Sequence, residues 1–273
     1  LDAQTIKQFA KSRYTPMRDN RFSVVDFDGS DDYIALDSDI SLTGEFTFNF
    51  WLSTTVTSTN YILGHSTNQS WIRLNQSSSE LKFKIDGVDA GTITSFATLA
   101  DGNWFALTVT RDSSNVIKGY VNGVQDGTTL TNANTFYFNE IANIFVNLEY
   151  SGSMSSVSVY NTAKSAEEVY AIYQQGITYD ESSLSGLQGY WRMGDDTSKA
   201  YPTIADSSSN SNDGTMTSMA SDDIVQQMIS GYDMGAFEST GEELGGDFAR
   251  AVVADSWNAY ANMTVNSITG GVS

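Results

Sequence analysis

The sequence predicts an all-β protein folded as a sandwich of two antiparallel sheets, and three observations support this prediction. Short segments rich in β-branched and aromatic residues follow one another at intervals of about 8–12 residues, which is typical of sandwiches and jelly rolls. The segment EFTFNFWLS places Phe46, Phe48 and Phe50 on one side of a strand, and Thr47 and Asn49 on the other. Asp-Gly and Asn-Gly pairs, which favour tight turns, separate several of the segments.

The strand pattern begins at Phe22, continues to about residue 160 and gives way to a predicted helix. Further strand-like segments are YILGH, WIRLNQ, LKFKIDG, GTITSFATL, WFALTVTRD, IKGYVNGVQDG and ANIFVNLEY. Tight turns are expected at four pairs, namely Asp86 and Gly87, Asp101 and Gly102, Asn122 and Gly123, and Asp126 and Gly127. In SAEEVYAIYQQG, Ser165 can cap a helix, Glu168 stands at the capping-box position and Gly176 can end the helix. We therefore expect one short helix to close the β-rich region.

Both ends of the chain differ in composition from this region. Residues 1–21 hold five of the 14 basic residues, and their apolar residues are spaced as in a short helix over residues 2–14. This basic N-terminal arm could lie on its own domain or dock onto an acidic neighbouring subunit. Residues 220–273 hold eight acidic residues and one basic residue, so we expect an extended acidic tail that lies on another surface. The folded domain is predicted to occupy residues 22–219.

Charge and cysteine content exclude several classes of function. With 14 basic and 33 acidic residues the formal net charge is −19, which opposes binding along a phosphate backbone, so no nucleic acid partner is expected. The sequence has no cysteine, which excludes thiolate chemistry, cysteine-ligated zinc and disulfides. It has no apolar run of about 18 residues, so no membrane insertion is expected.

Four blocks of sequence together resemble a known family. They are VVDFDGSDDYIAL, FTFNFWL, WFALTVTRDSSNVIKGYVNGV and GSMSSVSVYNTAKSAEEVYAIY, and they cover residues 22–175 in the order and spacing of the family. On these blocks the chain is similar to the laminin-G-like, concanavalin A-like jelly-roll domains. The resemblance implies two antiparallel sheets, one of them concave, with ligand-binding loops at the rim of the sandwich.

A second resemblance occurs at an unexpected place. The sequence GLQGYWRMGDD…IADSSSNSNDGT is similar to a segment that usually precedes the FDG block in this family, but here it follows the predicted helix. A second domain could begin here, or a strand at residues 190–193 could complete the same sandwich, so that residues 186–219 belong to it. The strand could also pair with a neighbouring molecule. Completion of the same sandwich is the simplest case, because a sheet edge satisfies backbone groups that an isolated strand leaves unpaired.

No catalytic site is predicted, so we do not expect an enzyme. Glycosidases of the wider jelly-roll superfamily carry their carboxylates on one strand in a Glu-x-Asp-x-(x)-Glu pattern, which places both acids on one face. No segment of this chain has that pattern. His65 is the only histidine and lies in GHS without a supporting signature, so we expect a structural histidine at a strand end.

The stretch DFDGSDDYIAL contains the candidate metal ligands Asp28, Asp31 and Asp32. Calcium prefers several oxygen ligands, and aspartates in a tight loop supply them together with backbone carbonyl groups. The alternative is an acidic hairpin tip, in which the aspartate side chains accept hydrogen bonds from the backbone.

Two features weaken the prediction of a metal site. The family block usually has two acidic residues before its last strand, and this chain has Ser155 and Ser156 there. A second acidic loop, residues 206–214, lacks the terminal glutamate of a calcium loop, so a turn is the better prediction.

A sugar site would need an exposed aromatic ring beside amide or carboxylate groups. Trp51 and Trp104 lie in segments that resemble core strands, so we expect both to be buried. Trp71 follows a turn that contains Asn68 and Gln69, and these three residues form the candidate ligand-binding site.

The combination of one laminin-G-like domain, a basic arm and an acidic tail is similar to structural proteins of tailed bacteriophages. We therefore expect a non-enzymatic virion protein on the particle surface, as a capsid decoration protein or part of a fibre or knob. Its termini would bind other virion proteins or identical subunits, and its rim loops would face outward, toward host-surface glycans. The alternative is a carbohydrate-binding or adhesion module from a larger secreted bacterial protein, located outside the cell or on its surface.

Overall fold

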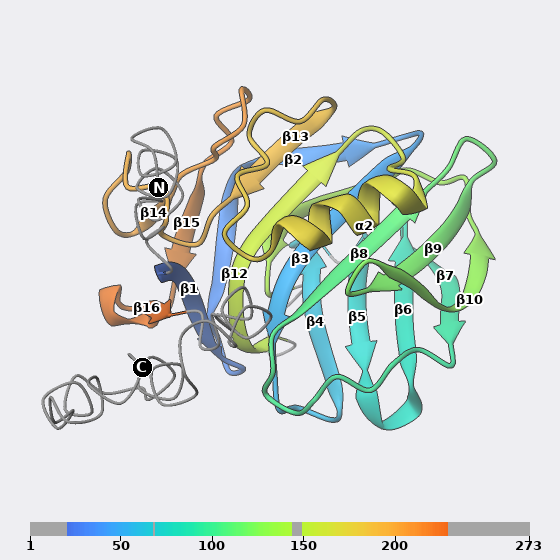
Figure 1. Ribbon diagram of the computed structural model, residues 1–273, viewed down its shortest axis with the longest axis horizontal. Helices are drawn as coiled ribbons and strands as arrows, with labels where there is room; N and C mark the ends of the chain where they lie inside the picture. The colour runs from blue at the N-terminus through green and yellow to red at the C-terminus, as the bar shows by residue number, and fades with distance from the viewer. Residues whose placement is uncertain (1–20, 68, 144–148, 229–273) are drawn as a thin grey trace, which may run out of the picture. The chain divides into compact units, whose positions relative to one another are not determined.

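The computed structural model describes residues 21–67, 69–143 and 149–228, which form two antiparallel sheets and one α-helix (Figure 1). The predicted fold class, an all-β sandwich with one short helix, is confirmed. Residues 1–20 and 229–273, which hold most of the predicted arm and tail, lie outside the described residues. Within the described part of the chain, no helix is long and apolar enough to cross a membrane.

The first sheet, sheet A, has eight strands in the order β10-β9-β8-β3-β12-β1-β16, with β13 also paired to β12. Its strands are β1 (Arg21–Asp28), β3 (Phe46–Ser53), β8 (Phe105–Arg111), β9 (Val116–Val121), β10 (Val124–Thr131), β12 (Ser151–Tyr160), β13 (Leu187–Trp191) and β16 (Ile224–Met228).

The second sheet, sheet B, also has eight strands, in the order β14-β15-β2-β11-β4-β5-β6-β7. Its strands are β2 (Tyr33–Leu42), β4 (Thr59–Gly64), β5 (Trp71–Asn75), β6 (Glu80–Ile85), β7 (Val88–Thr94), β11 (Phe136–Ile141), β14 (Thr203–Ile204) and β15 (Gly214–Thr217). Two short 3-10 helices, Gln76–Ser78 and Ser221–Asp223, precede β6 and β16.

The core lies between the two sheets and is filled by the alternate residues of each strand that point inward. Phe48 of β3 contacts Phe136 and Phe138 of β11, with ring centroids 5.1 and 5.7 Å apart, so these aromatic rings join sheet A to sheet B. Phe48 and Phe50 are fully buried, as the alternation in EFTFNFWLS predicts.

The predicted turns are found with one exception. Asp86, Gly87, Asn122 and Gly123 all have positive φ between two paired strands, as tight hairpin turns require. The prediction of a turn at Asp126 and Gly127 is wrong, because these residues lie inside β10, where the pairing with β9 shifts register. A side chain at Gly127 would come within 2.6 Å of Ile93 Cγ2, so the glycine serves a bulge and a close approach between strands.

The segment after the helix contributes strands to both sheets of the same chain. β13 pairs with β12, with Trp191 opposite Val157, and β15 pairs with β2 of sheet B. Trp191 is fully buried in the core, and its indole N–H donates to Asn212 O (2.9 Å). The strand at residues 190–193 therefore pairs within its own chain, which was one of the three alternatives.

The sheet continues past the boundary that was predicted at residue 219. β16 pairs with β1, with Val225 opposite Val24, so residues 224–228 are part of sheet A. The first residues of the predicted acidic tail are thus an edge strand of the sandwich.

Candidate functional site

The outward face of sheet A is covered by α2 (Ala166–Gln175), which Figure 1 shows in front of β12, β3 and β8. The helix begins with the predicted capping box, in which Ser165 and Glu168 bond each other's backbone N–H groups. The ring of Tyr173 stacks on Trp51 of β3, with centroids 5.9 Å apart and planes 23° apart. Trp51 is buried as predicted, but beneath the helix, on the outward side of the sheet.

Glu181 fastens the segment between α2 and β13 to the same face. Its side chain is buried, with 2% exposed, and it accepts hydrogen bonds from Asn49 Nδ2 (3.0 Å), Ser158 Oγ (2.7 Å) and the Tyr160 hydroxyl. Burial raises the pKa of Glu181, and the hydrogen bonds from these three side chains oppose that shift. Asn49 of β3 and Ser158 of β12, which are outward polar residues, are therefore satisfied within the protein.

Among the described contacts, no helix or loop segment covers the outward face of sheet B as α2 and the Glu181 segment cover sheet A. A row of paired residues crosses the sheet from Ala35 through Glu140, Gly64 and Trp71 to Lys84. The adjacent row consists of core residues, so alternation directs the first row outward. Several outward side chains of this sheet are half-buried, namely Tyr33, Arg73, Lys82, Lys84, Tyr137 and Asn139. This face is the candidate ligand-binding surface.

Three residues of this face, Tyr61, Trp71 and Arg73, form an aromatic cluster. The rings of Tyr61 and Trp71 meet edge to face with centroids 5.4 Å apart. Arg73 Cζ lies 5.7 Å from the Tyr61 ring and 5.3 Å from the Trp71 ring, and Arg73 Nη1 donates to the Tyr61 hydroxyl (3.4 Å). The cluster is separate from the main core, and its contacts hold both rings in place.

The structure places Trp71 differently from the exposed ring that the sequence pattern favoured. Only 9% of Trp71 is exposed, because Tyr61 and Arg73 contact it from neighbouring positions on β4 and β5. Gln69 is exposed, and Asn68 lies outside the described residues. Trp104, predicted to be buried, is half-buried, and its indole donates to Gln227 Oε1 (3.1 Å).

Glu140 lies beside this cluster and is the residue of the face that sequence reasoning missed. Its side chain is 8% exposed, and its Oε2 has no hydrogen-bond partner among the described residues, as is also true of Arg73 Nε. Burial raises the pKa of Glu140, while the electrostatic effect of nearby His65 opposes that shift. Glu140 is paired with Ala35 on β2 and with Gly64 on β4. Neither of these small residues has a polar side chain that could bond the carboxylate.

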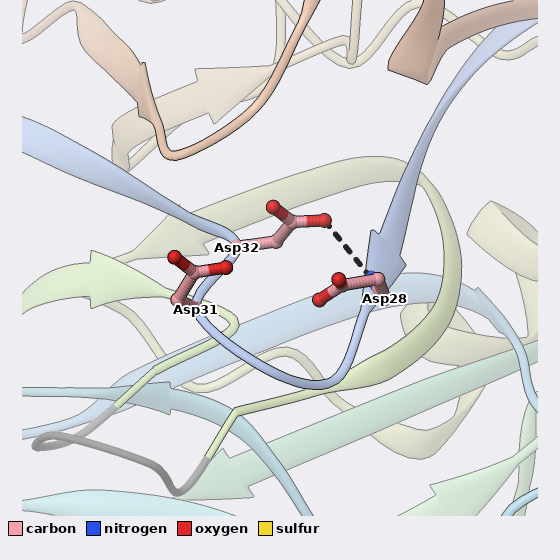
Figure 2. Close-up of side chains that lie close together, drawn as sticks. All are labelled: Asp28, Asp31 and Asp32. Atoms are coloured by element: carbon pink, nitrogen blue, oxygen red, sulfur yellow. Dashed lines mark hydrogen bonds between the residues drawn. The ribbon is translucent and has the colours of Figure 1, made fainter.

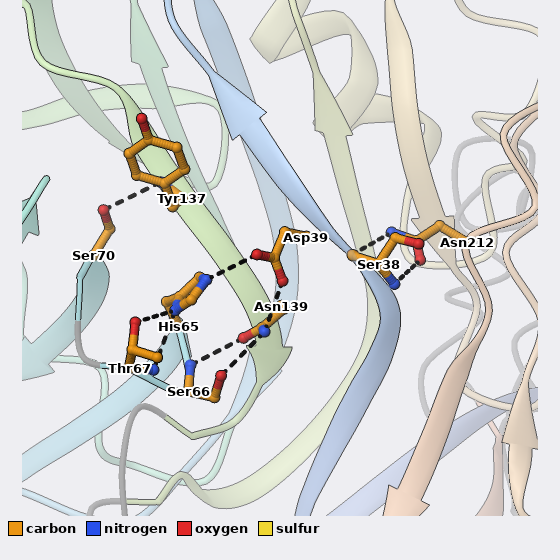
Figure 3. A network of polar contacts seen from close by, with 9 residues as sticks. All are labelled: Ser38, Asp39, His65, Ser66, Thr67, Ser70, Tyr137, Asn139 and Asn212. Carbon is orange, nitrogen blue, oxygen red and sulfur yellow. Dashed lines mark hydrogen bonds and ion pairs between the residues drawn. The ribbon is translucent and has the colours of Figure 1, made fainter.

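His65 has the structural role that was predicted for it, at the end of β4. The backbone N–H of Thr67 donates to His65 Nδ1 (3.1 Å), so the neutral imidazole carries its proton on Nε2 and donates to Asp39 Oδ2 (3.2 Å) (Figure 3). Asn139 Nδ2 donates to Asp39 Oδ1 (2.9 Å) and to Ser66 Oγ (3.1 Å). Both ring nitrogens thus serve to fix the loop after β4.

Asp28, Asp31 and Asp32 come together as predicted, with one oxygen from each within 4.8 Å of the others (Figure 2). Asp32 Oδ2 accepts from Asp28 N (2.9 Å), and Asp28 Oδ1 accepts from Ser30 N (2.7 Å), which is the acidic hairpin alternative. Burial and the neighbouring charges of Asp28, Asp223 and Asp31 raise the pKa of Asp32, although the bond from Asp28 N opposes this. The spacing fits the oxygen shell of Ca²⁺, so calcium remains a prediction.

The loop at residues 206–214 is a turn, as predicted. The carboxylate of Asp206 accepts hydrogen bonds from the backbone N–H groups of Tyr190, Ser208 and Asn212, each 2.9 Å long. Asn212 bridges the loop to Ser38, accepting from Ser38 N (2.8 Å) and donating to Ser38 O (2.9 Å) (Figure 3).

We expect calcium to raise the melting temperature of the protein if it binds the acidic loop, since a ligand of the folded state stabilises that state. Asp31→Asn should remove most of the increase, because one charged ligand is lost, whereas Asp37→Asn, with the same charge change at an exposed position, should retain it. Differential scanning fluorimetry with CaCl₂ and MgCl₂ measures both effects. An increase of equal size in both variants would contradict the assignment.

Glu140→Gln is expected to stabilise the protein at pH 7 by about 1 kcal/mol, the usual scale of a single substitution. The pKa of Glu140 is raised in the folded state, so the folded protein binds more protons than the unfolded one, and stability falls as the pH rises through this range. The difference between variant and parent should therefore close near pH 4. Urea unfolding at the two pH values measures it, with the exposed Glu45→Gln as control. A destabilised variant at pH 7 would contradict the buried charge.

The comparisons with known proteins place this geometry in a family. A family model described as the concanavalin A-like lectin/glucanases superfamily, Laminin_G_3, matches residues 28–170. No curated protein matches the chain. A crystal structure of a Bacteroides ovatus protein proposed to bind carbohydrate is similar, with a TM-score of 0.58, 16% identity and coverage of 77% of this chain. The chain spans 60% of the length of that protein.

Two other solved structures have lower similarity. A heptameric SAP-like pentraxin from Limulus polyphemus has a TM-score of 0.48 and 16% identity, covering 57% of this chain and 83% of its own. Domain 4 of the Geobacillus stearothermophilus arabinanase AbnA, solved with arabinotriose, has a TM-score of 0.42 and 18% identity, covering 55% of this chain and 75% of its own. With its TM-score of 0.58 and 16% identity, the Bacteroides ovatus structure shows a shared fold, and the family match covers more than half of the sequence. The chain belongs to the concanavalin A-like lectin/glucanases superfamily.

Proposed function

We propose that this chain is a non-enzymatic carbohydrate-binding protein whose glycan contacts the outward face of sheet B. The observation that carries the proposal is the difference between the two outward faces. On sheet A, α2 and the Glu181 segment cover the polar residues, whereas sheet B presents half-buried aromatic, cationic and amide side chains. Among the described residues, only sheet A is covered in this way, so we expect a ligand of extended shape to bind the second of these surfaces.

The chemistry of this face suits a saccharide. Aromatic rings pack against the apolar C–H faces of a sugar ring, and charged or amide groups bond its hydroxyls. Here the accessible rings of the face are those of half-buried Tyr33 and Tyr137. Tyr61 and Trp71 are buried and, together with Arg73, are already held by one another, so little side-chain entropy would be lost when a ligand contacts this cluster. The Bacteroides ovatus protein, whose fold is shared, is proposed to bind carbohydrate, and this supports the same ligand class.

A virion role is the second candidate, and the composition of the termini favours it. Residues 1–21 are basic and residues 220–273 are acidic, so each could bind a complementary surface on a neighbouring subunit or another virion protein. In this case the sandwich is displayed on a phage particle, with the face of sheet B directed toward the host. A module exported from a bacterium as part of a larger protein would use the same face of sheet B, but it would need no assembly with other subunits.

Arg73→Ala is expected to weaken glycan binding by about tenfold or more, because the arginine both bonds the ligand and holds the two rings. Tyr170→Ala, a 49% exposed aromatic residue on α2, should leave binding unchanged. A glycan array followed by titration calorimetry with the strongest ligand gives both values, and thermal melts of the variants check folding. Binding that is lost in Tyr170→Ala and kept in Arg73→Ala would refute the proposed face. Release of reducing sugar from that ligand would refute the non-enzymatic assignment.

The virion candidate predicts an oligomer that depends on the termini. Light scattering of the full chain should give a defined oligomer, and a variant without residues 1–20 and 229–273 should be a monomer, since β16 is retained in the sandwich. A monomeric full chain would favour the exported module.

A further inference from the structure

A pocket lies on sheet A, at the edge formed by β1 and β16. Its volume is about 410 Å³, which is near the lower end of small-molecule sites. The lining residues come from β1, β16, the segment after α2 and the loop after β13, and they are Arg21, Ser23, Thr178, Arg192, Gly194, Asp195, Thr197 and Gln226. None of them belongs to the outward face of sheet B.

The pocket is built on fixed elements of the fold. Trp191 is buried in the core, so the next residue, Arg192, is held at the surface beside it. A side chain at Gly194 would come within 2.6 Å of Ile224 Cγ2, which shows that the loop after β13 packs directly on β16. Ser23 N donates to Asp195 Oδ1 (2.6 Å), and Gln226 Nε2 donates to Ser23 Oγ.

The charges of the pocket are balanced. Arg21 and Arg192 bring two guanidinium groups, while Asp195 also lines the pocket and Asp180 Oδ2 lies 3.6 Å from Arg192 Nη1. A free anion would therefore meet carboxylates as well as cations. A neutral ligand that both donates and accepts hydrogen bonds is the better match, because the guanidinium and amide groups donate and the carboxylate accepts.

We propose that this pocket is a second saccharide site, which binds one neutral sugar unit through its hydroxyl groups. Planar guanidinium and carboxylate groups offer parallel donors or acceptors, a geometry that matches two neighbouring hydroxyls of a sugar ring. The site goes beyond the proposed function, since it lies on a different sheet and uses different residues. Two separate sites would let one domain hold a glycan chain at two points and so increase its apparent affinity.

The test is a titration of the ¹⁵N-labelled full chain with neutral monosaccharides, namely glucose, galactose, mannose and arabinose, followed by NMR. We expect at least one sugar to shift the amide signals of Ser23, Gly194 and Gln226. Arg192→Gln should weaken that binding by about tenfold, since it removes charged donors. Lys199→Gln, which removes a cation that is also paired with a carboxylate but lies outside the pocket, should leave it unchanged.

The outcomes separate this proposal from the one for sheet B. Absence of shifts at the three amides with all four sugars would overturn the pocket as a saccharide site, whatever happens at Trp71. Shifts with glucuronate and acetate alone would overturn it in favour of an anion site. Equal weakening in both variants would show an effect of overall charge and would also overturn it. Thermal melts of both variants establish that each is folded.

Discussion

The buried carboxylate of Glu181 anchors the segment after α2 to one outward face of the sandwich, and the proposal of a glycan surface on the other face depends on this contact. A two-sheet sandwich has two outward faces, and the polar residues of each must bond water, the protein or a ligand. On sheet A, Glu181 accepts from Asn49, Ser158 and Tyr160, and the segment that carries it continues from α2. This contact closes one face with protein, so the location of the proposed glycan surface follows from it.

Much of the fold could be predicted because it depends on local patterns. Alternation in β3, the capping box at Ser165 and the Asx-type turn at Asp206 each involve residues that are close in sequence. The same holds for His65, whose Nδ1 accepts from a residue two positions away. Pairing of β16 with β1 could not be predicted, since the two strands come from opposite ends of the described chain.

The candidate site was predicted less well, because burial on a sheet face depends on the neighbouring strand. The sequence around Trp71 indicates an exposed residue after a turn, but the Trp71 ring is covered by Tyr61, which lies on β4. Glu140 carries no signal in its own strand, and its place on the face is set by pairing with Ala35 of β2 and Gly64 of β4, which are distant in the sequence. The acidic loop was found because Asp28, Asp31 and Asp32 are near one another in the sequence as well as in space. The pocket at the β1 edge joins four distant segments and could not be found from any of them.

The most direct test of the glycan face uses the indole N–H signals of the tryptophans, of which the chain has five. Trp71 lies in the aromatic cluster of sheet B, Trp51 is beneath α2 on sheet A, and Trp191 is in the core. Titration of the ¹⁵N-labelled chain with the strongest glycan from an array should shift the Trp71 signal and leave those of Trp51 and Trp191 in place. A shift of Trp51 with no change at Trp71 would mean that the ligand binds the covered face, and the assignment to sheet B would be wrong.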